Sequence, residues 1–181
     1  MWQFRSFVES DLPLLVSWRN EPHVLRWFPR AFAGIEDARH VLADRLDGRS
    51  PVRMWLAVLD QHPVGFLQSF PVAADQDIVV RVRDPEAVCF DFLIGDPARV
   101  GRGLGGAMIA EFCRQVLVVE YPDAPRFLAA PDARNHRSLG ALRKAGFEQG
   151  WWIQPEAADY AEVTCTAPRE KFGPDGSTLG P

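Results

Sequence analysis

One carboxylate and a cluster of glycines stand out between Asp91 and Gly106. An apolar, strand-like run that contains Asp91 leads through a turn into a glycine-rich loop, which runs into the start of a helix. Backbone N–H groups at a helix N-terminus have no partner within the helix and carry partial positive charge, and glycines let a phosphate come close to them. This order of features predicts a catalytic base next to a binding site for the phosphates of a cofactor.

The glycine loop matches more than one pattern. Gly101, Gly103 and Gly106 fit the G-x-G-x-x-G pattern of dinucleotide-binding folds, which is weak evidence when it stands alone. The loop lies past the midpoint of the chain, and a long turn at residues 95–100 separates it from the preceding strand. Both features disfavour a nicotinamide or flavin enzyme. The Gly-Lys-Ser/Thr ending of a Walker loop is absent. A glycine-rich turn that only allows tight helix packing is the remaining alternative.

A second motif follows at residues 135–147. With both motifs, the chain resembles the GCN5-related N-acetyltransferases, a family with an Arg/Gln-x-x-Gly-x-Gly/Ala loop and a later helix of the form Asn-x-x-Ala/Ser-x-x-x-Tyr-x-Lys-x-Gly-Phe. Here the loop spans residues 100–105, and the helix motif is matched by Asn135, Ser138, Lys144, Gly146 and Phe147. Two motifs in the order typical of the family are more specific than either one alone.

Further segments are similar to one branch of that family, the aminoglycoside 6′-N-acetyltransferases. They are residues 18–20 and 23–27, the strand-like residues 63–70, and the aspartates Asp84, Asp91 and Asp96 around the expected fourth strand. The resemblance therefore covers most of the chain.

The hydrophobic pattern predicts an α+β fold around one sheet. The resemblance implies a mixed central sheet of six to seven strands, splayed between the fourth and the fifth and flanked by helices. Residues 1–172 are expected to form a single acetyltransferase domain, and residues 173–181 a flexible tail. Residues 73–86 are predicted to be irregular. Helices are expected at residues 12–18, 22–28, 35–46, 103–118 and 135–145, and strands at residues 2–7, 52–59, 63–72, 88–94, 127–130, 147–153 and 160–166.

The resemblance also implies that acetyl-CoA binds where the strands at residues 88–94 and 127–130 separate. Amides of the glycine loop would hold the pyrophosphate, and backbone groups of the fourth strand would pair with the pantetheine arm and polarise the thioester carbonyl. Asn135 is expected to contact the cofactor, to cap its own helix, or to do both. The expected cofactor-binding residues are Phe92, Leu93, Ile94, Val100, Gly101, Arg102, Gly103, Leu104, Gly105, Gly106, Asn135, Ser138 and Lys144.

Asp91 is the predicted catalytic residue. In a strand it shares one face with Cys89 and Leu93, and a carboxylate among apolar residues costs free energy unless it is paired or functional. Desolvation would raise its pKa and make it a better base for an attacking ammonium, directly or through water. The alternative is that Asp91 faces a structural arginine or water.

The acceptor is expected to lie against further polar and aromatic residues. Gln68 stands between apolar strand neighbours and so needs a partner, while Asp75 and Asp77 could each meet a second ammonium or remain solvated loop charges. The aromatic candidates could equally be core residues. The expected substrate-binding residues are Trp27, Gln68, Phe70, Asp75, Asp77 and Asp91.

Three positions depart from the family pattern. Val100 stands where the loop usually has Gln or Arg, and Leu142 where many members have a tyrosine that is thought to protonate the departing thiolate. The aromatic pair that the branch has before its fourth strand is replaced near residues 78–79, which bears on acceptor specificity.

Bulk composition limits the other possibilities. A formal net charge of −4 argues against nucleic acid as the main partner and is compatible with a cationic substrate. No apolar run approaches a membrane span, and the first residues do not open a signal peptide, so the cytoplasm is the expected location. Three separated cysteines, Cys89, Cys113 and Cys165, predict buried reduced thiols and no metal site.

These observations predict an acetyl-CoA-dependent N-acetyltransferase that acts on a primary amine by direct attack. The resemblance implies that the acceptor is the 6′-amino group of aminoglycosides. The alternatives are another small amine, such as a hydroxylamine or a lysine-derived amine in siderophore assembly, and a catalytically weak acyl-CoA-binding module. The chain is expected to be a monomer or a homodimer. Trp151 and Trp152 are expected to be buried in the last strands, with an exposed contact as the alternative.

Overall fold

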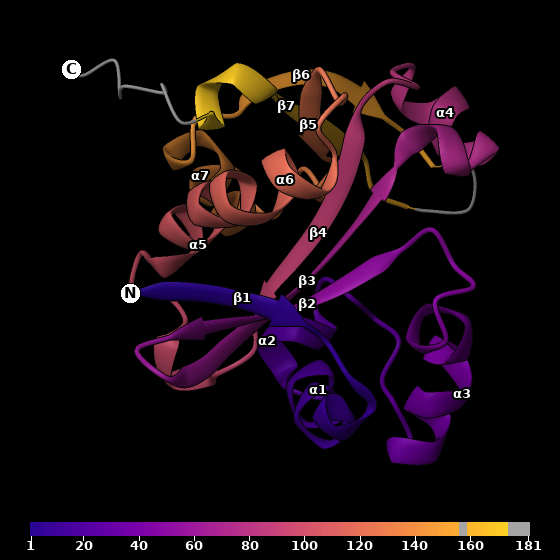
Figure 1. Ribbon diagram of the computed structural model, residues 1–181, viewed down its shortest axis with the longest axis vertical. Helices are drawn as coiled ribbons and strands as arrows, with labels where there is room; N and C mark the ends of the chain where they lie inside the picture. The colour runs from indigo at the N-terminus through magenta and orange to yellow at the C-terminus, as the bar shows by residue number, and fades with distance from the viewer. Residues whose placement is uncertain (156–158, 174–181) are drawn as a thin grey trace. The chain divides into compact units, whose positions relative to one another are not determined.

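The computed structural model describes residues 1–155 and 159–173. Their strands form a seven-stranded sheet in the order β1-β2-β3-β4-β5-β7-β6 (Figure 1). β4 and β5 pair in parallel, and the pairs β1–β2, β2–β3, β5–β7 and β6–β7 are antiparallel. This mixed sheet confirms the predicted fold class. The strands are β1 (Trp2–Ser6), β2 (Arg53–Leu59), β3 (His62–Pro71), β4 (Val88–Ile94), β5 (Arg126–Ala129), β6 (Glu148–Ile153) and β7 (Glu162–Pro168).

The chain divides into two compact units. Unit 1 contains Met1–Phe70 and Asp91–Leu104, and unit 2 contains Pro71–Phe90 and the chain from Gly105 onward. Asp91 therefore opens the part of β4 that belongs to unit 1. Residues 174–181 of the predicted flexible tail lie outside the described residues.

Unit 1 packs three helices against one face of its strands. The helices are α1 (Leu12–Arg19), α2 (Pro22–Leu25) and α3 (Ile35–Leu46), and α1 contacts both of the others. Apolar residues at helical spacing on α1 and α3 meet alternate residues of β2, β3 and β4, which is how a half-buried sheet and amphipathic helices form a common core. This core contains Phe7, Leu12, Leu15, Trp18, Val24, Phe32, Ala38, Leu42, Met54, Leu56, Phe66 and Leu93.

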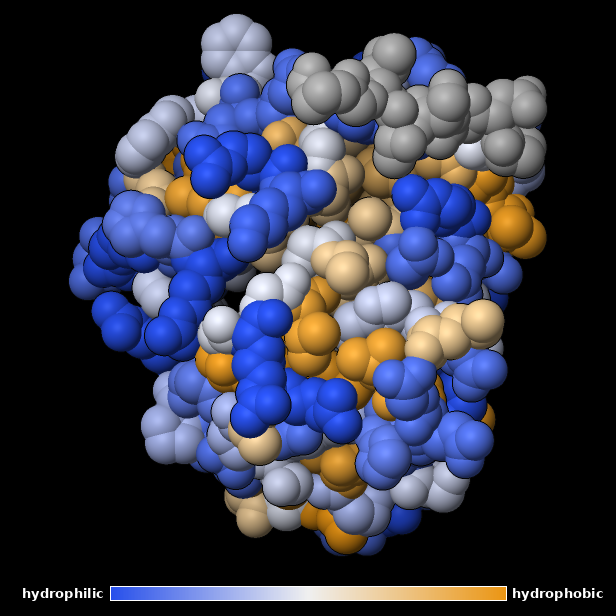
Figure 2. Space-filling model, turned by 90° about the vertical axis from the view of Figure 1, so that its left-hand side faces the viewer, coloured by the Kyte–Doolittle hydropathy of each residue, from blue (hydrophilic) through white to orange (hydrophobic). Residues whose placement is uncertain are grey.

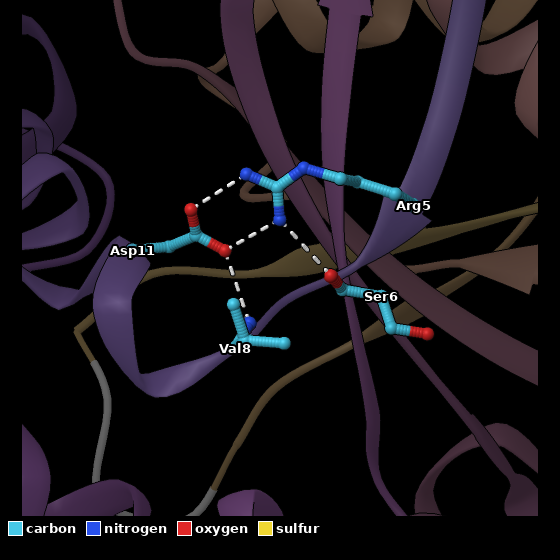
Figure 3. Close-up of polar contacts among 4 residues, drawn as sticks. All are labelled: Arg5, Ser6, Val8 and Asp11. Carbon is cyan, nitrogen blue, oxygen red and sulfur yellow. Dashed lines mark hydrogen bonds and ion pairs between the residues drawn. The ribbon is translucent and has the colours of Figure 1, made fainter.

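A bidentate ion pair holds the end of β1 to the turn that precedes α1 (Figure 3). The two terminal nitrogens of Arg5 donate to the two carboxylate oxygens of Asp11 at 2.6 and 2.7 Å, and the Val8 amide donates to Asp11 Oδ2 at 3.0 Å. The bonds from Arg5 are the main reason why the pKa of Asp11 lies below its ordinary value. The pair fixes where α1 begins, and α1 carries one side of the pocket described below.

Unit 2 contains the helices α4 (Gln76–Val82), α5 (Leu104–Phe112), α6 (Val118–Glu120) and α7 (His136–Lys144). The first residue of α5, Leu104, is the last residue of unit 1. A π-helical turn, Cys113–Leu117, joins α5 to α6. Phenylalanine rings form much of the core: Phe90 lies 5.5 Å from Phe147 and 6.1 Å from Phe112 between ring centroids. Figure 2 shows hydrophilic residues over much of the face that it views, with smaller hydrophobic areas between them.

Two local predictions were wrong. Residues 73–86 are not irregular, because Asp75 caps a short helix, α4, by accepting bonds from the amides of Asp77 and Ile78. The aromatic pair Trp151 and Trp152, which we expected to be buried, is 71% exposed at both positions. A register irregularity between Gln149 and Trp152 interrupts the alternation that would turn one of the two rings inward. The three cysteines are buried free thiols, as predicted.

Candidate active site

A pocket of about 220 Å³ opens in unit 1 between the helices and the sheet face that carries Asp91. Its apolar walls come mainly from α1, α3 and the segment that joins α2 to α3, and its polar residues come from five positions. The lining residues are Leu15, Arg19, Phe28, Arg30, Phe32, Val41, Leu42, Arg45, Phe66, Gln68, Asp91, Phe92 and Leu93. The pocket thus brings one carboxylate into an otherwise apolar and cationic enclosure.

Asp91 is held in place by a relay of two hydrogen bonds. The Gln68 amide nitrogen donates to Asp91 Oδ2 at 2.7 Å, and Arg45 donates to the Gln68 carbonyl oxygen at 2.8 Å. Gln68 lies on β3 and Arg45 on the last turn of α3. Asp91 is therefore the partner that Gln68 was predicted to need. Among the described residues, the arginine reaches Asp91 through Gln68 and not by a direct hydrogen bond, so the alternative of a structural arginine bonded to Asp91 is not observed.

The environment of Asp91 raises its pKa above the ordinary aspartate value. Burial is the largest cause, and the Gln68 hydrogen bond and the charges of Arg45 and Arg19 act in the opposite direction. The side chain is only half-buried, so a ligand in the pocket can reach a carboxylate that protein atoms otherwise surround. A carboxylate in this state is a stronger base than a solvated one and suits proton transfer from an amine.

Arg19 crosses the pocket between two aromatic rings. Its guanidinium carbon lies 5.1 Å from the Phe28 ring centroid and 5.3 Å from that of Phe32, which are cation–π distances. One terminal nitrogen donates to the Arg30 carbonyl oxygen at 3.0 Å. Its buried Nε has no hydrogen-bond partner among the described residues. Burial lowers the pKa of Arg19, as it does for Arg45, but a guanidinium remains protonated.

The end of β4 is fixed by hydrogen bonds to β3 and to α2. The Gly95 amide donates to the Val64 carbonyl oxygen at 2.9 Å, and His23 Nε2 bonds to the Ile94 carbonyl oxygen at 2.9 Å. A side chain on Gly95 would collide with the buried Trp18 ring, because a Cβ there would lie 1.9 Å from it. Glycine at this position lets the strand end pass directly over the core.

The glycine loop has the backbone that the sequence predicts for a phosphate cradle. Gly101 and Gly103 adopt φ angles of +78° and +76°, which other residues rarely tolerate. Apart from the adjoining residues of the chain, nothing lies within 4 Å of a Cβ built on either one. α5 begins directly after Gly103. Arg102 is exposed beside it, and Val100 is half-buried. The loop therefore leaves room beside its two left-handed glycines and leads directly into the N-terminus of α5. The amides of a helix's first turn have no partner within the helix, so the binding of a phosphate there stays a prediction.

The remaining predicted cofactor residues pack in unit 2. A Cβ on Gly106 would lie 2.8 Å from Lys144 Cβ, and one on Gly105 would lie 3.1 Å from Ala141 Cβ, so these two glycines allow α5 to approach α7. Asn135 is buried and caps α7 by accepting a bond from the Ser138 amide at 3.1 Å. The cap is thus confirmed, while contacts of these residues with a cofactor stay a prediction.

The predicted acceptor residues separate into two groups. Gln68 and Asp91 line the pocket, together with the aromatic residues Phe28 and Phe66. Trp27, which stacks under Arg26, and the buried Phe70 do not line it. Asp75 and Asp77 are exposed residues of unit 2 at the start of α4, and their role stays a prediction.

The sequence reasoning missed Arg19 and Arg45. Both carried a signal, because each falls where a core-facing stripe expects an apolar residue: Arg19 is four positions after Leu15, and Arg45 is three positions after Leu42.

Comparison with known proteins agrees with this fold. The sequence profile of the acetyltransferase (GNAT) domain matches residues 7–154. The chain belongs to the GNAT acetyltransferase family. Two curated relatives, aminoglycoside N(6′)-acetyltransferases type 1 from Klebsiella pneumoniae and Serratia marcescens, are each 29% identical over 161 residues, which is 84% of this GNAT chain and 77% of each relative. The crystal structure of aminoglycoside acetyltransferase AAC(6′)-Ib with coenzyme A and kanamycin superposes with a TM-score of 0.81 at 24% identity, over 95% of this chain and 97% of that one.

Two negative findings complete the description of this GNAT chain. In residues 1–155 and 159–173, no group of three or more His, Cys, Asp or Glu side chains could hold a metal ion. The same described residues include no helix with the length and apolar character that crossing a membrane requires.

Proposed function

We propose that this chain is an acetyl-CoA-dependent N-acetyltransferase in which Asp91 receives the proton of the acceptor amine. The observation that carries the proposal is the half-buried Asp91 carboxylate, with a raised pKa, at a pocket large enough for a small amine. Membership of the GNAT family supplies the reaction class. Residues 1–172 form the catalytic domain in this proposal.

The roles of the chain's own residues follow from their chemistry. Acetyl-CoA, when bound, supplies the acetyl group as an activated thioester. The amides that follow Gly101 and Gly103 would hold its diphosphate, and backbone groups at Phe92–Ile94 would pair with its pantetheine arm. Asp91 binds the acceptor as an ammonium and takes its proton, which leaves a neutral, nucleophilic amine.

No tyrosine protonates the leaving thiolate in this scheme. Leu142, at the position where many relatives carry one, is fully buried in α7. A thiol has a pKa of about 8.5, so a free thiolate collects a proton from water near neutral pH. The absence of an acid at Leu142 therefore does not block turnover.

The comparisons support the 6′-amino group of an aminoglycoside as the acceptor. Two relatives that cover most of this chain are aminoglycoside N(6′)-acetyltransferases, and AAC(6′)-Ib is known in complexes with coenzyme A and either kanamycin or ribostamycin. The small-amine acceptors of siderophore assembly and a catalytically weak acyl-CoA-binding role are the competing proposals. The chain is proposed to act in the cytoplasm, as a monomer or a homodimer.

A coenzyme A release assay separates these proposals. The full chain is incubated with acetyl-CoA and, one at a time, with kanamycin, ribostamycin, small diamines and a lysine-containing peptide, and free thiol is followed with a chromogenic reagent. The proposed function predicts turnover with at least one amine and N-acetylated product by mass spectrometry. Tight acetyl-CoA binding without turnover of any amine would favour the binding module instead.

A further inference from the structure

The Gln68 side chain links an arginine to a carboxylate, and its two ends differ in chemistry. On one side Arg45 donates to the Gln68 carbonyl oxygen at 2.8 Å, and on the other side the Gln68 amide nitrogen donates to Asp91 Oδ2 at 2.7 Å. A side-chain amide has nearly the same shape when it is turned over, so that its oxygen and nitrogen exchange places. The partners of Gln68 therefore decide which end faces Asp91.

Asp91 alone does not decide this orientation. A carboxylate only accepts hydrogen bonds, but a protonated carboxyl group also donates one, so Asp91 can pair with either end of the Gln68 amide. Arg45 can only donate, because a guanidinium has no acceptor. With Arg45 in place the Gln68 oxygen has to face the arginine and the nitrogen has to face Asp91, since the opposite orientation brings N–H donors together. A donor on Asp91 favours its carboxylate form.

Helix α3 holds Arg45 where this role requires it. Arg45 is half-buried in the last turn of α3, the end of a helix that favours a positive charge. Leu42 and Leu46, one turn before it and directly after it, pack in the core of unit 1. On the other side, β3 fixes Gln68 opposite Met54 of β2. The arginine thus meets β3 from a helix that the core anchors.

We propose that Arg45 is a positioning residue for the acetyl transfer: it fixes the Gln68 amide with its nitrogen toward Asp91, so that Asp91 meets the acceptor as an unprotonated carboxylate. The inference rests on the proposed function and deepens it, because a protonated Asp91 cannot take a proton from an ammonium. Arg45 acts in this role through Gln68 and not by contact with the reacting atoms.

The charges around Asp91 allow the role of Arg45 in orienting Gln68 to be separated from its charge. They come from α1, α3 and the segment that joins α2 to α3. The charged side chains are Arg19, Arg30, Arg45 and, paired with Arg30, Asp37. Burial raises the pKa of Asp91; the Gln68 hydrogen bond is the largest opposing cause, followed by the charges of Arg45 and then Arg19. If Arg45 acted by its charge alone, its loss would matter less than the loss of Gln68.

The pH profile of kcat/KM distinguishes the two roles. Without Arg45, as in Arg45→Met, the Gln68 amide can turn and offer its oxygen to a protonated Asp91. The acid limb should then move to higher pH by about one unit or more, and further than in Gln68→Leu. Combining Gln68→Leu with Arg45→Met removes the turned oxygen and should bring the limb part of the way back. At alkaline pH, where Asp91 is unprotonated, kcat/KM of Arg45→Met should approach that of the parent.

Two further variants complete the set. Arg45→Lys keeps a cation that can only donate, so its acid limb should stay close to that of the parent. Arg39→Met is the matched control for the loss of an arginine from α3, because Arg39 pairs with Glu9 and Glu36 at the surface and does not line the pocket. The acid limb of this control should not move.

Carbon-13 NMR follows the same titration without acetyl-CoA or acceptor. The chain is labelled at its aspartate carboxyl carbons, and the signal of Asp91 is assigned by its loss in Asp91→Asn. The titration midpoint should be lowest in the parent and in Arg45→Lys, higher in Gln68→Leu and highest in Arg45→Met.

The outcomes distinguish this inference from the proposed function. The inference fails if Arg45→Met moves the acid limb and the NMR midpoint no further than Gln68→Leu does, or if the double variant moves them further than Arg45→Met. An equal fall of kcat/KM at every pH in Arg45→Met would also overturn it, because that is the effect of a residue that only supports packing. If no amine is acetylated, the proposed function fails, and the NMR titration alone decides the role of Arg45.

Discussion

Replacing Gly95 by alanine tests how tightly the end of β4 packs over the α1 core. The new Cβ would lie 1.9 Å from Cδ2 and 2.2 Å from Cγ of Trp18, far inside the contact distance of about 3.5–4.0 Å between carbon atoms. Trp18 is only 5% exposed, so its ring cannot turn away into solvent. The backbone at Gly95 does not have a positive φ, and the collision alone therefore decides the cost.

The expected loss is at the upper end of what overpacking causes, about 3 kcal/mol of unfolding free energy. For a chain of this length that corresponds to a fall in Tm of roughly 6–12 °C. Urea and thermal unfolding followed by tryptophan fluorescence and circular dichroism would measure it. Gly140→Ala is the control: it lies inside α7 with nothing within 4 Å of a Cβ, so it should stabilise the chain by about 0.5–1 kcal/mol. A Gly95→Ala chain as stable as the parent would refute the packing of Trp18 described here.

Three further predictions concern single contacts. In the parent, the Gln68 amide donates a hydrogen bond to Asp91 and lowers the pKa of that carboxylate. Gln68→Leu removes this bond, so the pKa of Asp91 should rise and the acid limb of the pH profile of kcat/KM should move to higher pH. Asp11→Asn removes a carboxylate whose pKa is lowered by Arg5. In the parent, the stability that this carboxylate contributes is present above the ordinary aspartate pKa of about 3.9 and is lost as the pH falls. Urea unfolding between about pH 5 and pH 3 should therefore show that the free energy of unfolding declines less steeply in the variant. Gly103→Val forces a β-branched residue into a left-handed backbone and should weaken acetyl-CoA binding by at least about tenfold in calorimetry.

Each of these predictions has an outcome that contradicts it. An unmoved acid limb in Gln68→Leu would mean that the limb does not report Asp91. If the stability of the parent and of Asp11→Asn depends on pH in the same way, the Arg5–Asp11 ion pair of Figure 3 does not contribute to the loss of stability in acid. For the loop, Gly34→Val is the control, since Gly34 is extended and has nothing within 4 Å of a Cβ; equal acetyl-CoA affinity in the two valine variants would reject the phosphate cradle.

The sequence predicted the elements whose signals are local. The apolar stripe of α3 gave its limits, Ile35–Leu46, and the glycine loop gave the start of α5 within one residue. The same reasoning failed at α4, because its N-cap Asp75 and the charged residues around it are equally typical of a loop.

The chemistry of the site depends on contacts between distant positions, and only part of it was predictable. Asp91 could be singled out as a carboxylate in an apolar strand, and Gln68 as a polar residue in need of a partner. That the two bond to one another, and that Arg45 completes the relay, requires residues 45, 68 and 91 to meet across three elements. The hydrophobic periodicity of a single element does not show which distant residues come into contact. The arginines of the pocket could therefore be found only from the structure.

The most direct test of the account is the kinetics of Asp91→Asn with the best acceptor found in the amine panel. The substitution keeps the shape of the side chain and removes its basicity, so kcat/KM should fall by about 10²–10⁴-fold, the usual contribution of a positioned base, while the Kd for acetyl-CoA stays close to that of the parent. Asp44→Asn, at an exposed site outside the pocket, serves as the matched control. An Asp91→Asn chain that acetylates the same amine at the parental rate would contradict the central role of this carboxylate.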